Sequence, residues 1–398
     1  MSISKRASQI APSITLEITA KAKKMKADGI SVIGFGAGEP DFNTPEYIIE
    51  SAKKALDIGF TKYTPASGTV ELKKAIVDKF ATDNGLTYKP EQIVISSGAK
   101  SSLCHVIEAL VDEGDEVIIP SPYWLTYPEL VKLAGGECVY VACTKENNYL
   151  MTASQLEDAI TDKTKCLILN SPSNPTGAVY SEEQLKEIAN VCEKHGIYVI
   201  SDEIYEKLIY NGKKHFSIAA MSDYMYDHTV IVNGMSKTYS MTGWRIGYIA
   251  APIQIAKAVS SMQSHTTSNA NSIAQYASVA ALTDIRGAEF ISKMQAVFDE
   301  RRKYMVETLK GIENVSCTEP DGAFYVFVDV SKLYGKTFNG KTITGSLSFA
   351  DCALEKGVAL IPGVAFGDDN CIRLSYAISI EDIKEGLYRL NEFIKEVK

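Results

Sequence analysis

The chain has 398 residues, of which 45% are apolar and 23% are charged, and its formal net charge is −8. This length favours two domains, and the acidic balance with scattered Lys and Arg residues speaks against a nucleic-acid-binding protein. No uncharged apolar segment is long enough to span a bilayer, and the first residues lack the apolar core of a signal peptide, so a protein without membrane association is expected.

The cysteines and histidines give no pattern typical of disulfides or of a metal site. The eight cysteines are dispersed without a Cys-x-x-Cys pair, and some, such as Cys166 and Cys192, fall in apolar runs, where a free thiol packs as a small hydrophobe. A reduced, cytoplasmic protein is therefore expected. The five histidines lack the spacing of metal ligands, so no metal site is predicted.

Helices and short apolar strands alternate in the middle of the chain. A capping box at Ser181–Gln184 predicts a helix that runs to about His195 and ends at Gly196. Continuous apolar runs are typical of strands buried on both faces, and the alternation predicts an α/β fold with a mostly parallel sheet wrapped by helices. The predicted strands are 93–96, 117–119, 166–169, 197–201 and 229–232.

Groups capable of binding or catalysis follow each of these strands. They are an anion-binding turn at 97–100, an indole at Trp124, an amide at Asn174, a carboxylate with a phenol at 202–205, and the amine of Lys237. In parallel α/β sheets, ligands bind beyond the carboxyl ends of the strands. The sequence therefore predicts one site along this edge of the sheet.

The pattern changes after about residue 285. A long helix is predicted from Ala288 to about Lys310, and a final helix opens near Ser379. Strands are expected at 323–330, 358–361 and 371–376, and a flexible loop at 331–348. This mixture predicts a second, smaller α+β domain. The expected division is 1–44 for an N-terminal arm and part of the small domain, 45–287 for the large domain, and 288–398 for the small domain.

Lys237 lies between an apolar strand and an arginine, Arg245, eight residues later. A lysine amine that is held away from water can condense with an aldehyde. An arginine fork suits a phosphate. These are the two ends of pyridoxal phosphate, so the stretch 230–245 is a candidate cofactor site.

Several motifs, in this order, resemble the fold-type I pyridoxal-phosphate enzymes, and most closely the prokaryotic-type aspartate aminotransferases. The resemblance covers nearly the whole chain, and the motifs together are far more specific than any one of them. They are Gly36–Phe42, Tyr63–Pro65, Ser121–Trp124, Asn174–Gly177, Ser201–Tyr205, Lys237–Arg245 and Arg373–Ser375.

The resemblance implies roles around the cofactor ring. Lys237 is expected to bind the cofactor aldehyde covalently and then to move the proton between the substrate α-carbon and the cofactor. Asp202 is expected to pair with the protonated pyridine nitrogen, and Tyr205 to donate to the 3′-oxygen. Asn174 is expected to hold the same oxygen, and Trp124 to stack on the ring.

It also implies a phosphate site. Backbone N–H groups of Gly98 and Ala99, at the start of a helix predicted from about Ser101, are expected to bind the phosphate together with Arg245. Ser236 is expected to add a hydroxyl. Tyr63 matches the family's tyrosine that reaches the cofactor of the neighbouring subunit, which implies a homodimer with shared active sites.

For the substrate, the resemblance implies that Arg373 binds the α-carboxylate with two parallel hydrogen bonds and that Gly38 offers a backbone N–H beside it. Lys100 matches the lysine that binds a second carboxylate. Trp124 and Asn174 are expected to contact the substrate as well. The stretch 263–269 resembles the family's subunit-contact segment.

The implied activity is transfer of the amino group of L-aspartate to 2-oxoglutarate, in two halves with ping-pong kinetics. Its partners would be amino acids and 2-oxo acids. Alternatives are an aminotransferase of other specificity (prephenate, aromatic or alanine-like), a pyridoxal-phosphate-dependent β-lyase, and a non-catalytic ligand-binding regulator domain. A dinucleotide fingerprint is absent, because Glu39-Pro40 follows Gly34–Gly38 where a third glycine and a helix should lie.

Overall fold

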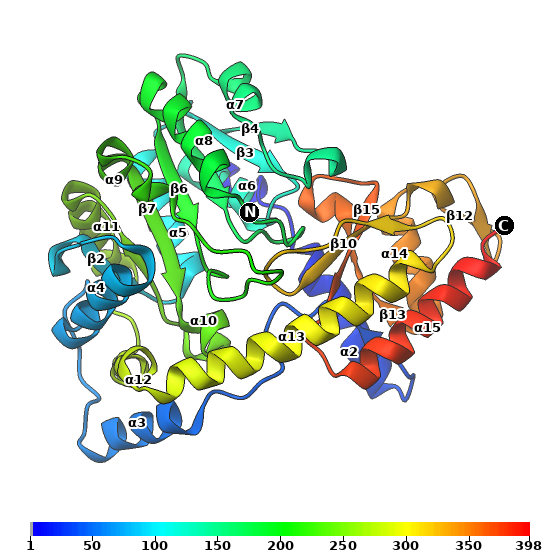
Figure 1. Ribbon diagram of the computed structural model, residues 1–398, viewed down its shortest axis with the longest axis horizontal. Helices are drawn as coiled ribbons and strands as arrows, with labels where there is room; N and C mark the ends of the chain where they lie inside the picture. Colours follow the sequence, from blue (N-terminus) through cyan, green and yellow to red (C-terminus); the bar gives the residue numbers. More distant parts are fainter. Residues whose placement is uncertain (1–2) are drawn as a thin grey trace.

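The computed structural model describes residues 3–398 and confirms the α/β class. Its main sheet has seven strands in the order β2-β8-β7-β6-β5-β3-β4 (Figure 1). Only β8 runs against its neighbours, so the sheet is mostly parallel, as predicted. The strands are β2 (Ile93–Ser96), β3 (Glu116–Ser121), β4 (Glu137–Ala142), β5 (Thr164–Asn170), β6 (Tyr198–Asp202), β7 (Thr229–Gly234) and β8 (Gly247–Ala250).

Helices cover both faces of this sheet because its central strands are apolar on both sides. Ile200 packs with α5, α6 and α11 on one face, whereas its neighbour Val199 packs with α7, α8 and α9 on the other. The second face is completed by α3, α4 and α12, which pack on β2 and β8. The helices are α3 (Glu46–Asp57), α4 (Val70–Asn84), α5 (Ala99–Leu110), α6 (Thr126–Ala134), α7 (Ala153–Ala159), α8 (Glu182–His195), α9 (Asp223–His228), α10 (Met235–Thr238), α11 (Ile253–Thr266) and α12 (Ser272–Thr283).

Two strands of the main sheet were not predicted. The edge strand β4 is half-exposed, so it lacks the continuous apolar run that marks the central strands. The strand β8 has only four residues and begins two residues after Arg245. The predicted helix near Ser101 begins two residues earlier, at Ala99. The capping box at Ser181 and the glycine cap at Gly196 are confirmed.

A second, four-stranded sheet has the order β14-β15-β10-β9. It packs with α13 (Arg286–Lys310), α14 (Ser346–Glu355) and α15 (Ile380–Glu396) around an apolar core that includes Phe298, Phe349 and Leu387. Ser379 caps α15, as predicted. Its strands are β9 (Ser316–Cys317), β10 (Tyr325–Asp329), β14 (Ile361–Pro362) and β15 (Cys371–Ser375).

Two expectations for this region were wrong. The predicted strand 358–361 is divided into β13 (Val358–Ala359) and β14, which belong to different sheets. The stretch 331–348, expected to be a flexible loop, contains a β-hairpin of β11 (Thr337–Phe338) and β12 (Lys341–Thr342). Phe338 is buried and packs edge-on against Phe393 of α15, which anchors the hairpin.

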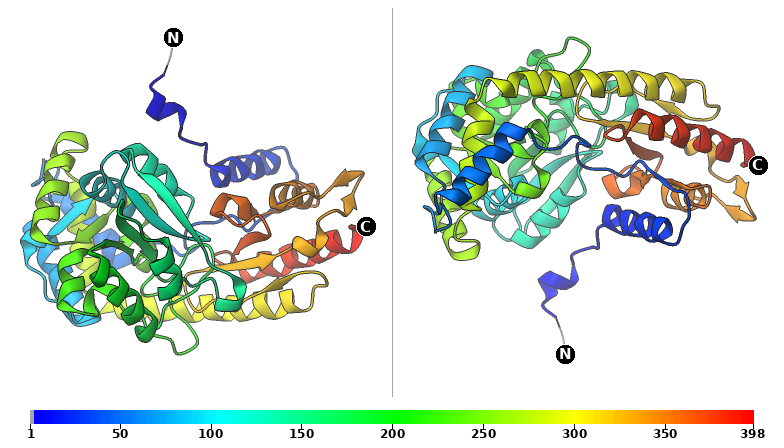
Figure 2. Two further views of the ribbon diagram at one scale, coloured as in Figure 1. Left: turned by 90° about the horizontal axis from the view of Figure 1, so that it is seen from above. Right: turned by 90° about the horizontal axis from the view of Figure 1, so that it is seen from below.

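The N-terminal segment joins this second sheet region. The strand β1 (Ile33–Gly34) pairs in parallel with β13, and Phe35 packs in the same core. It follows α1 (Lys5–Ser8) and α2 (Ile14–Ala27), and residues 3–13 extend away from both sheets (Figure 2). Within residues 3–398, no helix combines the length and apolar character that crossing a membrane requires.

We propose the division into 1–44, 45–287 and 288–398 as the domain organisation. Separate apolar cores on the two sheets and the pairing of β1 with β13 support it. The helix α13 runs from one core to the other (Figure 1).

Candidate active site

A cavity of about 670 Å³ lies where the carboxyl ends of the main-sheet strands face the second sheet. The fold brings there side chains that are up to about three hundred residues apart, because parallel strands deliver their following loops to one edge. Of the residues expected at a site, those that line it are Gly38, Ala99, Lys100, Trp124, Asn174, Asp202, Tyr205, Ser236, Lys237, Arg245 and Arg373.

Lys237 enters the cavity from α10, directly after the fully buried strand β7. Its Nζ donates to the carbonyl oxygen of Gly38 at 2.5 Å and lies 5.9 Å from the ring centre of Tyr205. Burial lowers the pKa of Lys237 from 10.5 to about 8; the charge of Glu39 opposes this shift and that of Arg373 adds to it. An amine with a lowered pKa is a better nucleophile and base near neutral pH.

Asp202 ends the buried strand β6 and is 3% exposed. Its Oδ2 accepts a 2.8 Å hydrogen bond from the hydroxyl of Tyr127, and its Oδ1 accepts one from the backbone N–H of Ile204 at 3.2 Å. Burial raises the pKa of Asp202 to about 6, although both hydrogen bonds oppose the rise. A buried carboxylate of this kind is suited to a cationic partner such as a protonated ring nitrogen.

Tyr127 is a site residue that the sequence analysis missed. It lies three residues after Trp124, and the two rings meet edge to face at 5.4 Å. That spacing puts both side chains on the same face of one helical turn, a signal that could have predicted it. Through its bond to Asp202, Tyr127 fixes the direction in which the carboxylate points.

Tyr205 lies beyond Asp202 in the loop after β6, and its hydroxyl lies 3.0 Å from the hydroxyl of Tyr325. Tyr325 is the first residue of β10 and was not predicted as a site residue. Both side chains are buried, at 4% and 1% exposed, and both line the cavity.

The start of α5 and Arg245 form a candidate phosphate site. Because Ser96 of β2 pairs with Gly247 of β8, the residues just outside these strands come together. Gly98 has a φ of 91°, and a Cβ there would lie 2.3 Å from the Arg245 guanidinium, so only glycine fits. Gly98 offers no side-chain cap to α5, and its own N–H, expected to bind the phosphate, donates instead to Ser96 O at 2.7 Å. The candidate anion site is therefore formed by the N–H groups at the start of α5, beginning with Ala99.

Arg373 reaches the cavity from β15 and is 3% exposed. It donates to two neutral oxygens, Asn174 Oδ1 at 2.9 Å and Gly36 O at 3.3 Å. Its Nε is buried without a hydrogen-bond partner among residues 3–398. Burial lowers the pKa of Arg373. A buried guanidinium with spare donors is suited to an incoming carboxylate.

Lys100 provides a second cationic group in the cavity. Its Nζ lies 4.9 Å from the ring centre of Trp124, and Trp124 is half-buried. Burial lowers the pKa of Lys100, and the charge of Arg245 adds to that effect. Besides Lys237 and Arg245, the residues that line the cavity include four basic side chains, namely Lys100, Arg373, and Lys23 and Lys26 of α2.

Three expected features do not line this cavity. Gly98 does not line it, although the adjacent Ala99 does. Tyr63 is 90% exposed and does not line it, and none of 263–269 does so either. Gln263 is buried, and its amide donates to Ala66 O at 2.5 Å and to Ile95 O at 2.7 Å. Gln263 therefore ties the loop that carries Tyr63 to β2.

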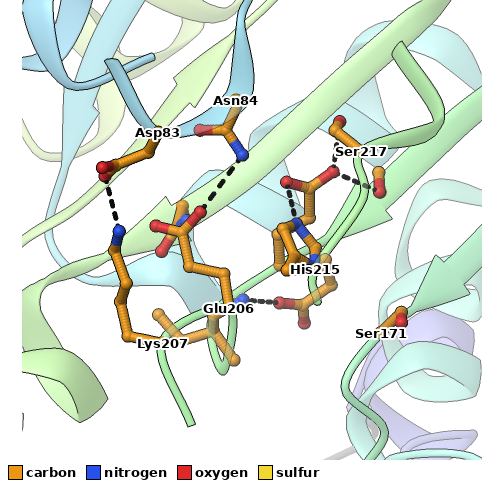
Figure 3. A network of polar contacts seen from close by, with 12 residues as sticks. Asp83, Asn84, Ser171, Glu206, Lys207, His215 and Ser217 are labelled. Atoms are coloured by element: carbon orange, nitrogen blue, oxygen red, sulfur yellow. Dashed lines mark hydrogen bonds and ion pairs between the residues drawn. The ribbon is translucent and has the colours of Figure 1, made fainter. Parts of the chain in front are cut away.

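A polar network surrounds Glu203, the residue after Asp202, and Figure 3 shows His215, Ser217 and Glu206 within it. Glu203, 1% exposed, accepts hydrogen bonds from Ser201 Oγ at 2.9 Å and Ser217 Oγ at 2.6 Å. His215 Nε2 lies 2.9 Å from the second oxygen of Glu203. Ser201 and Glu203 share one face of the strand, and Asp202 between them faces the cavity.

The same network contains a potential set of metal ligands. Glu203, Glu206 and His215 offer ligand atoms within 4.8 Å of one another. However, the ammonium of Lys79 lies 2.5 Å from Glu206. Although burial favours the neutral acid, Lys79 lowers the pKa of Glu206 to about 2. Lys79 thus already supplies the positive charge that a metal ion would bring.

The donor set of the cavity fits pyridoxal phosphate. An anion cradle at Gly98 and Arg245 lies at one end, and a buried carboxylate at Asp202 suits the ring nitrogen. Between them, Lys237 offers an amine with a lowered pKa. This fit accounts for two features: the Arg245 guanidinium beside the start of α5, and the Asp202 carboxylate, which contacts no cation among residues 3–398.

Comparison with known proteins agrees with this donor set. Residues 30–390 match the family described as aminotransferase class I and II. The aspartate aminotransferase of Bacillus subtilis is 48% identical, with 100% of both chains covered. A probable aspartate/prephenate aminotransferase of Aquifex aeolicus is 45% identical over 99% of both chains. The crystal structure of the aspartate aminotransferase from Rhizobium meliloti superposes with a TM-score of 0.96 at 40% identity, covering 100% of both chains.

Proposed function

The chain belongs to the class I and II aminotransferases, which use pyridoxal phosphate, and we propose that it moves the amino group of L-aspartate to 2-oxoglutarate. The observation that carries this proposal is the meeting of Lys237, Asp202 and Arg373 in one cavity. An amine, a carboxylate for the cofactor ring and a guanidinium for the substrate are the three parts that transamination requires.

When bound, pyridoxal phosphate supplies an electron sink that makes the substrate α-proton removable. Lys237 would act as the base that takes this proton from the substrate α-carbon and delivers it to the cofactor. Asp202, held by Tyr127, would keep the ring nitrogen protonated. Arg373 and the N–H of Gly38 orient the α-carboxylate, so that the α-carbon faces Lys237.

Lys100 is our proposed contact for the second carboxylate of aspartate and 2-oxoglutarate. The support is its place in the cavity and its packing against Trp124. Its partly buried charge would be balanced by a dicarboxylate and not by a monocarboxylate such as alanine.

Lys100→Met should therefore change specificity and leave the chemistry intact. We expect kcat/KM for aspartate to fall by roughly 10–100-fold, the value of one charged hydrogen bond, and that for alanine to change by less than about threefold. Stopped-flow half-reactions with a panel of aspartate, glutamate, alanine and phenylalanine measure both. Lys89→Met, an exposed lysine outside the cavity, is the control. Equal losses for alanine and aspartate would remove Lys100 from the substrate site.

Prephenate is a second candidate acceptor, because the Aquifex aeolicus relative is named a probable aspartate/prephenate aminotransferase. Prephenate carries a 2-oxo acid and a second carboxylate, so it presents the same two charges to Arg373 and Lys100. An acceptor panel of 2-oxoglutarate, oxaloacetate and prephenate, each with aspartate or glutamate as donor, separates the two activities.

We propose a homodimer in which each subunit supplies Tyr63 to the phosphate of the other subunit's cofactor. The support is the 90% exposure of this tyrosine in the single chain. Leu56, Ile58 and Val70 near it are also exposed by more than half, which is typical of a surface that another protein covers.

Mixing two inactive or weakened variants tests this arrangement. Tyr63→Phe should bind pyridoxal phosphate roughly 10-fold more weakly, because one hydrogen bond to a charged group is lost. In a hybrid dimer with Lys237→Ala, the Tyr63→Phe chain would receive the intact Tyr63 of its partner. We therefore expect one site per hybrid dimer with wild-type cofactor affinity, measured by fluorescence titration. Hybrids that retain the weak affinity would show that Tyr63 acts within its own chain or not at all.

We propose that the protein is cytoplasmic. All eight cysteines are free, and burial raises the pKa of Cys166, Cys192 and Cys371, so these thiols are unreactive packing groups. Such a set suits a reducing compartment.

A further inference from the structure

The hydroxyls of Tyr205 and Tyr325 meet at 3.0 Å inside the cavity. We infer that Tyr325 is a positioning residue whose hydroxyl donates to Tyr205 and strengthens the hydrogen bond from Tyr205 to the cofactor's 3′-oxygen. The inference rests on the proposed cofactor and deepens it, because it adds a residue from the second sheet to the control of the cofactor's protonation.

The geometry leaves these two side chains little freedom. Tyr205 follows β6 of the main sheet, whereas Tyr325 begins β10 of the second sheet and pairs with Ser375. Their rings meet edge to face, with centres 5.9 Å apart and planes at 82°. Phe324 packs against both rings, at 5.4 Å from Tyr205 and 4.7 Å from Tyr325. The contact therefore joins the two sheets at the site itself.

Counting protons gives the contact a direction. A phenol has one O–H to donate, and its oxygen can also accept. If the proton of Tyr205 is directed to the cofactor, the 3.0 Å contact is a hydrogen bond only when Tyr325 donates to the oxygen of Tyr205. Burial raises the pKa of both phenols, so both keep their protons at neutral pH. A hydroxyl that accepts a hydrogen bond becomes a stronger donor itself.

The aromatic ring of Tyr325 has a second role, which is to pack against Arg373. The guanidinium carbon of Arg373 lies 4.3 Å from the ring centre of Tyr325 and 5.0 Å from that of Phe366. Two aromatic rings thus hold the group proposed to bind the α-carboxylate. The hydroxyl acts on Tyr205 and the ring acts on Arg373, so variants can remove one without the other.

The test measures the bound cofactor directly. In the holoenzyme, the pH midpoint of the cofactor's visible absorption change reports when the nitrogen that joins Lys237 to the cofactor loses its proton. A weaker donor at Tyr205 stabilises the anionic 3′-oxygen less, so the nitrogen holds its proton to higher pH. Tyr325→Phe should therefore raise this midpoint by roughly 0.5 unit and leave KM for aspartate within about twofold.

A second variant separates the ring from the hydroxyl. Tyr325→Met removes both and fills the space with an adaptable side chain. It should raise the midpoint by the same amount and also raise KM for every amino-acid donor by roughly 10-fold, the worth of a desolvated cation–aromatic contact. If Tyr325→Phe does not fold, the midpoint of Tyr325→Met decides the question.

Controls distinguish the hydroxyl at the site from buried hydroxyls in general. Tyr210 is equally buried, and its hydroxyl donates to Ala323 O at 2.6 Å, outside the cavity. Tyr210→Phe should lower thermal stability and leave the midpoint unchanged. In a Tyr205→Phe background, Tyr325→Phe should shift the midpoint by no more than about 0.1 unit, because the residue through which it acts is gone.

The outcomes are distinct. A wild-type midpoint in Tyr325→Phe overturns the role of Tyr325 and leaves the proposed function standing, as does a full shift that persists without the Tyr205 hydroxyl. A purified wild-type protein that binds no pyridoxal phosphate overturns both.

Discussion

Replacing Lys237 with alanine is expected to reduce transamination of every donor by at least about 10⁴-fold. The variant loses both the nucleophile that bonds to the cofactor and the base that moves the α-proton. The phosphate cradle at Gly98 and Arg245 and the carboxylate of Asp202 remain. Lys237→Ala should therefore still bind pyridoxal phosphate, although without a covalent bond.

Borohydride treatment makes this expectation specific to one atom. In the wild-type protein, reduction should fix the cofactor irreversibly on the peptide that contains Lys237, as read by mass spectrometry. The same treatment of Lys237→Ala should leave no adduct. Lys207→Ala, on the far face of the sheet, is the matched control and should behave as wild type (Figure 3). Full activity in Lys237→Ala, or an adduct on another lysine, would contradict the assignment.

Arg373→Met should lower kcat/KM for all amino-acid donors by roughly 10²–10³-fold. Arg373 is buried, lines the cavity, and has one donor, Nε, without a partner among residues 3–398, so its loss would leave a substrate carboxylate desolvated and unpaired. The loss should be similar for aspartate and alanine, since both carry an α-carboxylate. This uniform loss distinguishes Arg373→Met from Lys100→Met, which is expected to affect aspartate much more than alanine.

The stability of the same variant supplies a control. Arg373 donates to neutral oxygens, so the ligand-free protein holds an unbalanced buried charge. Thermal unfolding of ligand-free Arg373→Met should occur at a temperature no lower than that of the wild type. A large fall would mean that Arg373 is chiefly structural, and the kinetic loss would then need another explanation.

The sequence predicted the parts of the fold that are encoded locally. Central strands such as β6 and β7 are buried on both faces, and their apolar runs are unambiguous. The half-exposed edge strand β4 lacks this signal, so it was missed. The strand β8 is buried throughout, but it begins with Gly247, a residue type depleted in strands, and this weakens its pattern. The hairpin at 337–342 was missed because it depends on Phe338 packing against a helix some fifty residues away.

In the candidate site, too, the residues marked by a local pattern were predicted, and one that depends on a distant contact was not. Residues at strand ends, such as Asp202 and Lys237, were predicted because topology brings strand ends together. Tyr325 was missed because its role arises from contact with Tyr205, 120 residues distant and in the other sheet. The predicted function of Tyr63 depends on a second chain, so it rests on the family resemblance and not on contacts within one subunit.

The alternation of side chains at the end of β6 has a further consequence. Asp202 faces the cavity while its neighbour Glu203 is held by Ser201, Ser217 and His215 on the opposite side. Hydrogen bonds to Asp202 on one side and to Glu203 on the other therefore fix the backbone between them without any ligand. The Asp202 carboxylate is thus desolvated once, during folding, and not again in each catalytic cycle. Replacing His215, which contacts Glu203 and does not line the cavity, is therefore expected to slow turnover without removing any contact to the cofactor.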